Sequence, residues 1–158
     1  MLGQVESIPE GSHLTLVRPV HPTAVLVEVP HAGLEVPSEI VPAIDAPADG
    51  VLRDSDLYVD ELYAEAPQRG ASMLVAHVSR YVVDLNRAAD DVDLDTVPDH
   101  PAPRGVQPRG VVWRMTTDGR SLLRRPLTYA ELEQRLARFH RPYHAALREA
   151  GPMTVMDL

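Results

Sequence analysis

The segment of residues 73–87 constrains the fold more than any other part of this chain. It starts with an apolar run, continues through Tyr81 and Val83, and ends in Asp84, Asn86 and Arg87 before a polar stretch. The pattern predicts a buried strand that ends in functional groups, which in open α/β sheets gather at the carboxyl ends of strands. The fold is therefore expected to contain a sheet with a polar site at one edge.

The polar residues of this segment predict a binding site for a carboxylate. Arg87 offers a planar guanidinium that matches a carboxylate in two hydrogen bonds, and the amide of Asn86 can donate another. In the alternative interpretation, Asp84 pairs with Arg80 or Arg87 and only fastens the end of a strand. The nine residues 79–87 leave both interpretations open.

A second strand is predicted over residues 23–29, a β-branched run that ends at Pro30. The turn that follows contains His31 and Gly33. A histidine directly after a buried strand, with a glycine that admits close backbone approach, suits a metal ligand or a catalytic imidazole. The alternative is a turn histidine that faces water. A shorter strand is predicted over residues 13–17.

A helix is predicted from Asp54 to Ala66, because an N-cap residue and acidic residues precede apolar positions at helical spacing. Asp54 and Asp56 form a pair of carboxylates at its start. Helix capping uses one of them, so the other is left for a further task, and a metal ligand is the obvious candidate.

The clearest helix starts at Thr128, which forms a capping box with Glu131, and ends at Gly151. Pro142 lies inside it and is expected to bend it. His140 and His144 are four residues apart on one face, as in two-histidine metal sites, but the glutamate of the helical zinc motif is absent. A partly buried interface pair is the favoured interpretation, and a metal site remains the alternative.

The remaining segments complete an α/β pattern within one domain, residues 1–158. We expect an irregular loop over residues 88–110, a short strand over 111–115, a turn at 117–119 and a final strand over 153–158. Strands that alternate with helices are typical of an α/β sandwich.

Composition excludes several classes of function. The chain of 158 residues has 15 Lys and Arg against 23 Asp and Glu, a formal charge of -8, which disfavours nucleic acid and anionic membranes as partners. No apolar run approaches the roughly 20 residues of a membrane span, so we expect a cytoplasmic protein. Cysteine is absent, which leaves histidine and carboxylates as metal ligands.

Four segments resemble N-formylglutamate amidohydrolase in the same order and at similar spacing: PHAG (30–33), RDSDLYVD (53–60), SRYVVDLNR (79–87) and RPYH (141–144). The resemblance covers most of the chain from Thr23 onward. It implies a three-layer α/β/α sandwich with a mixed sheet, phosphorylase/hydrolase-like, related to zinc carboxypeptidases and aspartoacylase. The implied reaction cleaves N-formyl-L-glutamate to formate and glutamate, a step of histidine degradation.

The resemblance also implies roles for individual residues. His31 resembles the first zinc ligand and Asp56 the acidic second ligand, with Asp54 as the less favoured choice. Asn86 and Arg87 resemble the pair that binds a substrate carboxylate in related deacylases, with Arg80 assisting. The implied partner is a small N-acyl amino acid; its acyl group and amino acid are left open, as is homo-oligomer formation.

The sequence departs from the family pattern at its C-terminus. In the family, the strand that resembles residues 153–158 continues into a histidine that is the third zinc ligand, and the later half carries a general-base glutamate. We therefore expect these groups after Leu158 in a longer hydrolase, and expect a chain ending at Leu158 to be inactive. The alternative function is a truncated, inactive carboxylate-binding or assembly module of the same fold, whose exposed last strand pairs with another chain.

Overall fold

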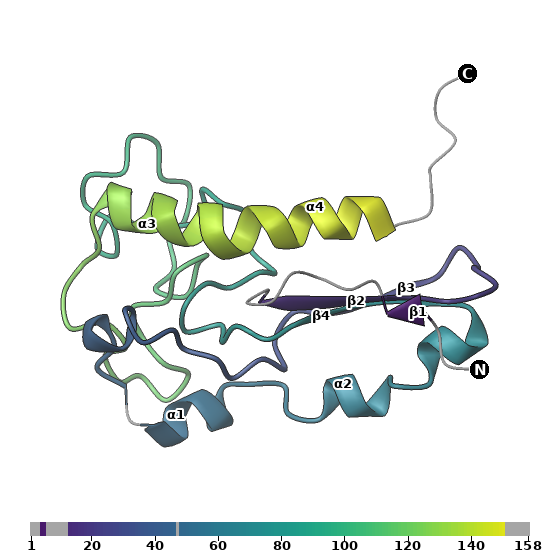
Figure 1. The fold of residues 1–158 in the computed structure, drawn as a ribbon. Coiled ribbons are helices and arrows are strands. Elements are labelled where there is room, and N and C mark those ends of the chain that lie inside the picture. The colour runs from purple at the N-terminus through teal and green to yellow at the C-terminus, as the bar shows by residue number, and fades with distance from the viewer. Residues whose placement is uncertain (1–3, 6–12, 47, 151–158) are drawn as a thin grey trace.

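A mixed β-sheet forms the centre of the fold (Figure 1). The computed structural model describes residues 4–5, 13–46 and 48–150. The sheet has the order β1-β2-β4-β3; β2 is antiparallel to β1 and β4, whereas β3 and β4 are parallel. The expected α/β class and mixed sheet are confirmed. The strands are β1 (Gln4–Val5), β2 (Leu14–Arg18), β3 (Leu26–Val29) and β4 (Ser72–Ala76).

Helices lie on both sides of this sheet in Figure 1. One long helical stretch runs along one side, and the short helices α1 and α2 lie on the other. The helical elements are η1 (Val41–Ala43), α1 (Ala48–Arg53), α2 (Val59–Leu62), η2 (Ala66–Arg69), α3 (Tyr129–Arg135), η3 (Leu136–His140) and α4 (Arg141–Ala150).

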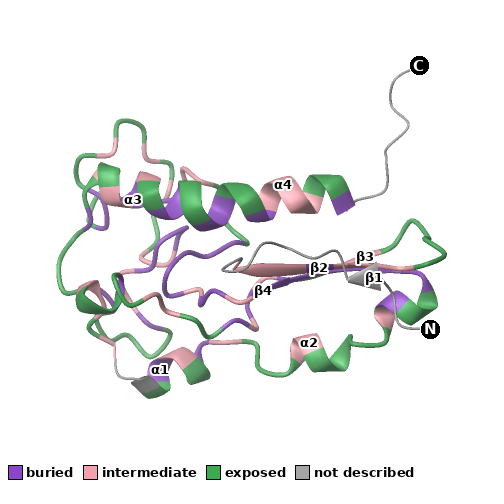
Figure 2. Ribbon diagram, viewed as in Figure 1, coloured by how far each residue is buried: buried purple, intermediate pink, exposed green. Residues whose placement is uncertain are grey.

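The core follows the alternation of side chains along the strands. In β4, Leu74 and Ala76 belong to the main core together with residues of the long helix, whereas Met73 and Val75 pack in a smaller cluster with Val29. Successive strand residues point to opposite faces, so the two clusters lie on the two faces of the sheet. Figure 2 shows the buried positions of the long helix turned toward the sheet. The helical contribution to the main core is Leu132, Leu136, Phe139, Tyr143 and Ala150.

Local signals account for the long helix. Thr128 and Glu131 form the predicted capping box. The helix continues to Ala150 through η3, a π-helical turn. Pro142 has no N–H to donate to the carbonyl four residues earlier, and wider turns of this kind often accompany such interruptions. The helix prediction is confirmed, and Gly151, its predicted end, lies outside the described residues.

The central segment is a strand only in its first part, and the prediction of a strand through Tyr81 and Val83 was wrong. β4 ends at Ala76, and the chain turns at Ser79, whose carbonyl accepts the N–H of Val82 at 2.9 Å. Tyr81 and Val83 are nevertheless buried. They pack beneath loops, and burial alone does not distinguish a buried turn from a buried strand.

The helix predicted from Asp54 to Ala66 forms only in part: residues 54–58 are not helical, and α2 (Val59–Leu62) lies within the predicted range. Asp54 follows α1 and donates its N–H to the Gly50 carbonyl at 3.0 Å, so it completes a helix end. Tyr58 has a left-handed backbone with φ of 65°, which separates this loop from α2.

Other predicted elements differ in extent. β3 is shorter than the predicted 23–29. Residues 111–115 form only isolated bridges, between Arg109 and Trp113 and between Met115 and Ser121. Residues 88–110 contain no helix or strand, as expected of a long loop. The predicted strand 153–158 lies outside the described residues, and within the described ones no helix is long and apolar enough to cross a membrane.

Candidate functional site

The parallel pairing of β3 and β4 brings the predicted site residues to one edge of the sheet. His31 follows the end of β3, and the segment with Arg80 and Asp84 follows the end of β4. The loop after α1 joins them, because the N–H of Asp56 donates to the His31 carbonyl at 3.0 Å. The residues that the sequence singled out at 31, 56, 80 and 84 therefore meet in space.

His31 is buried and is oriented through both ring nitrogens. Its Nε2 lies 2.7 Å from Oδ1 of Asp84. An ionised carboxylate only accepts hydrogen bonds, so Nε2 carries the hydrogen. Nδ1 then presents its lone pair to Nη2 of Arg80, which lies 2.8 Å away. The imidazole is therefore held between the Asp84 carboxylate at Nε2 and the Arg80 guanidinium at Nδ1.

Asp84 is the buried acceptor at the centre of this site. Besides His31, it accepts hydrogen bonds from the indole Nε1 of Trp113 and from the backbone N–H of Asn86, both at 3.0 Å. Burial opposes its ionisation, but the hydrogen bond from His31 and the charge of Arg80 outweigh burial, so the pKa of Asp84 lies below its usual value. Asp84 is thus a buried anion, neutralised by its neighbours.

Arg80 faces His31 and lies over the Trp113 ring, 4.9 Å from its centroid. Its Nη1 donates to the Asp54 carbonyl at 3.1 Å, and Nη2 lies 3.6 Å from Oδ2 of Asp84. Among the described residues, its buried Nε is a side-chain nitrogen without a hydrogen-bond partner. The positive charge of Arg80 therefore lies beside Nδ1 of His31 and the carboxylate of Asp84.

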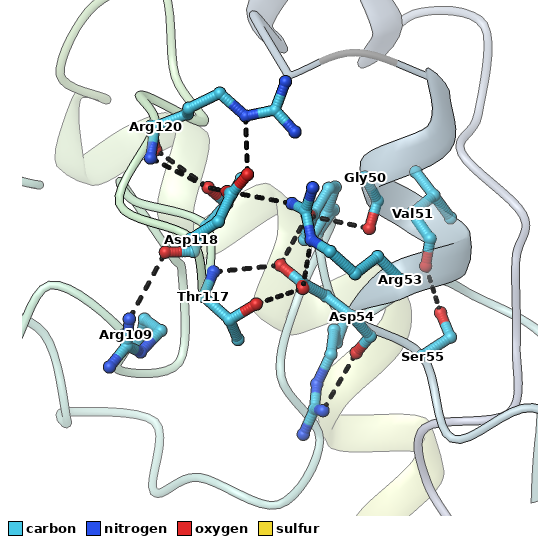
Figure 3. A network of polar contacts seen from close by, with 12 residues as sticks. Gly50, Val51, Arg53, Asp54, Ser55, Arg109, Thr117, Asp118 and Arg120 are labelled. Atoms are coloured by element: carbon cyan, nitrogen blue, oxygen red, sulfur yellow. Dashed lines mark hydrogen bonds and ion pairs between the residues drawn. The ribbon is translucent and has the colours of Figure 1, made fainter.

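Asp54 and Asp56, which the sequence could not separate, have different environments. Asp54 is buried, and its carboxylate accepts hydrogen bonds from the Tyr81 hydroxyl at 2.6 Å, the Arg53 Nε at 3.2 Å, and the hydroxyl and N–H of Thr117 (Figure 3). Burial opposes ionisation, but these donors lower the pKa of Asp54 to about 2. Asp54 thus ties the loop to the turn at residues 117–119, which the sequence predicted.

Asp56 is half-exposed and points toward His31. Its Oδ2 lies 3.4 Å from Nδ1 of His31, and its Oδ1 lies 3.8 Å from Nη1 of Arg80. Two ligand atoms of a tetrahedral zinc ion, each about 2.0–2.1 Å from the metal, are about 3.3 Å apart. His31 Nδ1 and Asp56 Oδ2 therefore fit two positions of one zinc ion.

No group of three histidine or carboxylate side chains arranged to hold a metal occurs in residues 4–5, 13–46 and 48–150. Asp84 does not complete the set because it contacts the opposite ring nitrogen of His31. A catalytic zinc usually has three protein ligands. Among the described residues, His31 and Asp56 are the two groups that lie at the separation of two zinc ligands in this site.

Asn86 and Arg87 are exposed next to this buried site. Nη1 of Arg87 lies 3.4 Å from Oδ2 of Asp91, and about half of its side chain is accessible. Such an exposed pair is weak and leaves the guanidinium available to a ligand. The structure thus keeps both predicted carboxylate binders at the surface and turns Arg80 toward His31.

His140 and His144 form an interface pair. Their rings are in contact, with centroids 4.2 Å apart and planes tilted by 41°. Their Nε2 atoms lie 2.8 Å and 3.0 Å from the carbonyl oxygens of Arg87 and Leu85, respectively. Since both Nε2 atoms donate to carbonyls, they are not available as metal ligands in this arrangement.

Two contributors to the site were missed in the sequence. Trp113, the sole tryptophan, was assigned only to a strand, and Thr117 only to a turn. Their partners, Asp84 and Asp54, are far away along the chain. No spacing rule predicts such contacts, although a single tryptophan near a polar loop is a signal worth testing.

Comparison with known proteins places this geometry in context. The sequence model of a family described as N-formylglutamate amidohydrolase matches residues 23–152. An N-formylglutamate deformylase of Pseudomonas aeruginosa is 36% identical over 129 residues, which are 78% of this chain and 44% of that protein. One of Pseudomonas putida is 34% identical over 131 residues, 78% of this chain and 43% of that protein.

A solved structure agrees with these matches. The N-formylglutamate amidohydrolase of Ralstonia eutropha superposes with a TM-score of 0.77 at 31% identity, over 88% of this chain and 50% of that one. A protein of Agrobacterium tumefaciens shares the fold with a TM-score of 0.59 at 19% identity, over 89% of this chain and 50% of that one. The chain thus spans about half the length of the relatives it matches.

Proposed function

Because this chain belongs to the N-formylglutamate amidohydrolase family, we propose that it forms part of a zinc hydrolase that cleaves N-formyl-L-glutamate into formate and glutamate. The observation that carries the proposal is the 3.4 Å separation of His31 Nδ1 and Asp56 Oδ2, which suits two ligands of one zinc ion. The named relatives supply the substrate class.

His31 and Asp56 are the residues that would hold the metal. Asp84 supports His31 from the other side: its carboxylate fixes the Nε2–H tautomer, so that Nδ1 faces the metal position. When bound, zinc supplies Lewis-acid chemistry, which polarises a carbonyl group and lowers the pKa of water to about 7. The third ligand and the general base are assigned to parts of the protein outside the described residues.

Asn86 and Arg87 are proposed to bind a carboxylate of the substrate. Arg87 can form two parallel hydrogen bonds with a carboxylate, and the Asn86 amide can add another. Both residues are exposed beside Asp84, and Asn86 is attached to the Asp84 carboxylate through its backbone N–H. This connection sets the carboxylate binders at a fixed place relative to His31. Arg80, with its buried guanidinium, is assigned to balancing the charge of Asp56 and Asp84.

The complete fold is proposed to be a three-layer α/β/α sandwich. Helices on both sides of the sheet support this proposal (Figure 1). The smaller apolar cluster at Met73 and Val75 also supports it, since it packs against Val59 of α2 on the face opposite the long helix.

The test compares aspartate variants of the full-length protein. We expect Asp56→Asn to lower zinc content, measured by mass spectrometry of the metal, and to abolish glutamate release from N-formyl-L-glutamate. Asp54→Asn should keep zinc but lower the free energy of unfolding by about 2–4 kcal/mol, since a buried, hydrogen-bonded charge is lost. Asp60→Asn, in α2, is the matched control for both readouts.

Two results would contradict the proposal. Loss of zinc in Asp54→Asn with full zinc in Asp56→Asn would exchange the roles of the two carboxylates. A zinc-loaded wild-type protein that releases no glutamate from the formyl substrate would refute the reaction, and binding of glutamate without turnover would favour a carboxylate-binding module.

A further inference from the structure

The segment of residues 82–87 lies outside the sheet, so its carbonyl groups need other partners. The long helix supplies them through its side chains. Nη1 of Arg135 donates to the Val82 carbonyl at 2.9 Å. Nε2 of His144 donates to the Leu85 carbonyl, and Nε2 of His140 donates to the Arg87 carbonyl. One helix face therefore replaces the backbone pairing that a strand would have provided.

The hydrogen bonds of the two histidines define their protonation. A backbone carbonyl can only accept, so Nε2 of each ring carries a hydrogen. The two rings are in contact at a tilt of 41°, and His140 is buried. Burial, reinforced by the neighbouring His144 and Arg141, lowers the pKa of His140 below its usual value, although the bond to the Arg87 carbonyl opposes this. The geometry therefore requires an Nε2–H donor on each ring.

These two bonds hold the chain on either side of Asn86. Leu85 and Arg87 are its immediate neighbours, and the N–H of Asn86 itself donates to Oδ1 of Asp84, the oxygen that also contacts His31. The backbone around Asn86 is therefore held from the long helix and from Asp84, the partner of His31, at once. Its side chain and that of Arg87 remain exposed.

We propose that His140 and His144 are positioning residues for carboxylate binding: they hold the backbone at Arg87 and Leu85 so that Asn86 and Arg87 meet the substrate in a prearranged geometry. This inference rests on the proposed function, which supplies the role of Asn86 and Arg87. A binding group whose backbone is held in advance loses less conformational freedom when the ligand arrives. The proposal also gives His144, the last residue of the RPYH segment (141–144), a role other than metal binding.

The test uses donor-deleting and donor-retaining variants of the full-length protein. Leucine at position 140 or 144 keeps much of the volume but removes the donor, whereas glutamine places an amide N–H near the position of Nε2. We expect His140→Leu and His144→Leu each to raise KM for N-formyl-L-glutamate about tenfold, with kcat changed less than about twofold. His140→Gln and His144→Gln should restore most of the affinity. His21→Leu, at an exposed position, is the control.

The pattern of the kinetic constants decides the outcome. Leucine variants with unchanged KM, or with kcat lowered at constant KM, overturn the inference. So does a glutamine variant that is no better than its leucine counterpart, because the donor would then be irrelevant. Zinc content should equal that of wild type in all four variants.

A second measurement does not depend on turnover or on the folding of any variant. Long-range ¹⁵N–¹H spectra of the wild-type protein report the tautomer of each imidazole, and we expect Nε2–H for both histidines. An Nδ1–H tautomer at either position overturns the inference. If the wild-type protein fails to hydrolyse N-formyl-L-glutamate while both rings show Nε2–H, the proposed function fails, and the hydrogen bonds from the two histidines to the carbonyls of Leu85 and Arg87 are still supported.

Discussion

At the scale of single residues, the site depends on one buried carboxylate more than on any cation. Asp84 accepts hydrogen bonds from His31, Trp113 and the backbone of Asn86, and is almost fully buried. Each of these donors belongs to a different part of the chain. Removing the charge of Asp84 therefore affects His31, Trp113 and the backbone at Asn86 together.

Replacement of Asp84 with asparagine tests this dependence. We expect Asp84→Asn to lower the free energy of unfolding by about 3 kcal/mol, because the cation of Arg80 loses a buried counter-charge. We also expect zinc affinity to fall about 10–100-fold, as is usual when the partner of a ligating histidine is lost. Denaturant unfolding and competition with a zinc chelator measure the two effects. Asp95→Asn, at an exposed ion pair, should change stability by less than about 0.5 kcal/mol.

The residue types in the site were readable from the sequence, but their partners were not. His31, Asn86 and Arg87 stood out because they follow predicted strands, and Asp56 stood out because it belongs to a carboxylate pair at a predicted helix start. One of the two interpretations paired Asp84 with Arg80 or Arg87; in the structure Arg80 lies 3.6 Å from Asp84, and the nearer partner, His31 at 2.7 Å, was not foreseen. Its contact with Trp113 joins residues 29 positions apart, and no local pattern predicts such a pair.

At the scale of elements, the helix from Tyr129 to Ala150 was the most predictable part, because its start depends on residues within one turn. Glu131 accepts the N–H of Thr128 at 2.8 Å and pairs with Arg125. The central strand was less predictable. Its apolar residues 81–83 are buried in a turn. The N–H of Asp84, just after them, donates to the carbonyl of Val111, which is distant in sequence, and no local pattern predicts this partner.

The charge of Glu131 makes the helix start sensitive to acid. The hydrogen bond and charge of Arg125, together with the cap at Thr128, lower the pKa of Glu131 to about 2. A lowered folded-state pKa adds stability above the ordinary value of 4.5, and this stability disappears as the pH falls toward 2. Glu131→Gln keeps the capping hydrogen bonds, so we expect a loss of about 0.5–1 kcal/mol at pH 7 that vanishes near pH 2.

Denaturant unfolding at several pH values measures this difference. Glu149→Gln, at an exposed position of α4, provides the comparison. An equal loss for Glu131→Gln at pH 2 and pH 7 would show that the charge does not contribute.

The turn after β3 requires glycine because two chain segments meet there. A Cβ at Gly33 would lie 2.6 Å from the Val78 carbonyl oxygen and even closer to the backbone of His77. The sequence suggested that this glycine admits a ligand, whereas the structure shows that it admits the extension of β4. We expect Gly33→Ala to lower the free energy of unfolding by at least about 3 kcal/mol.

Comparison with a second glycine, Gly119, distinguishes the cost of a steric clash from the cost of backbone strain. Gly119 has φ of 82° and open space around its Cβ position, so Gly119→Ala should cost only about 1–2 kcal/mol. Thermal or denaturant unfolding ranks the two variants. A smaller loss at Gly33 than at Gly119 would contradict the close approach.

At the scale of the whole molecule, the chain spans about half the length of its relatives, yet it brings together the first ligands of the proposed metal site. A ligand that binds only the folded state stabilises it in proportion to the logarithm of its concentration. We expect zinc at 100 times its Kd to raise the free energy of unfolding of the full-length protein by about 2.7 kcal/mol. His31→Ala should remove this increase, and calorimetry with and without chelator measures it.

The parallel pairing of β3 and β4 also governs the order of events during folding. The two strands are neighbours in the sheet, but the whole of residues 30–71 separates them along the chain. Closing so long a loop costs chain entropy before any contact repays it, and pairings of this kind form slowly. Asp56 lies within that loop and His31 at its beginning, so their meeting depends on its closure. A cation that bridges them therefore acts after the rate-limiting step, and we expect zinc to slow unfolding while leaving the refolding rate almost unchanged in stopped-flow measurements.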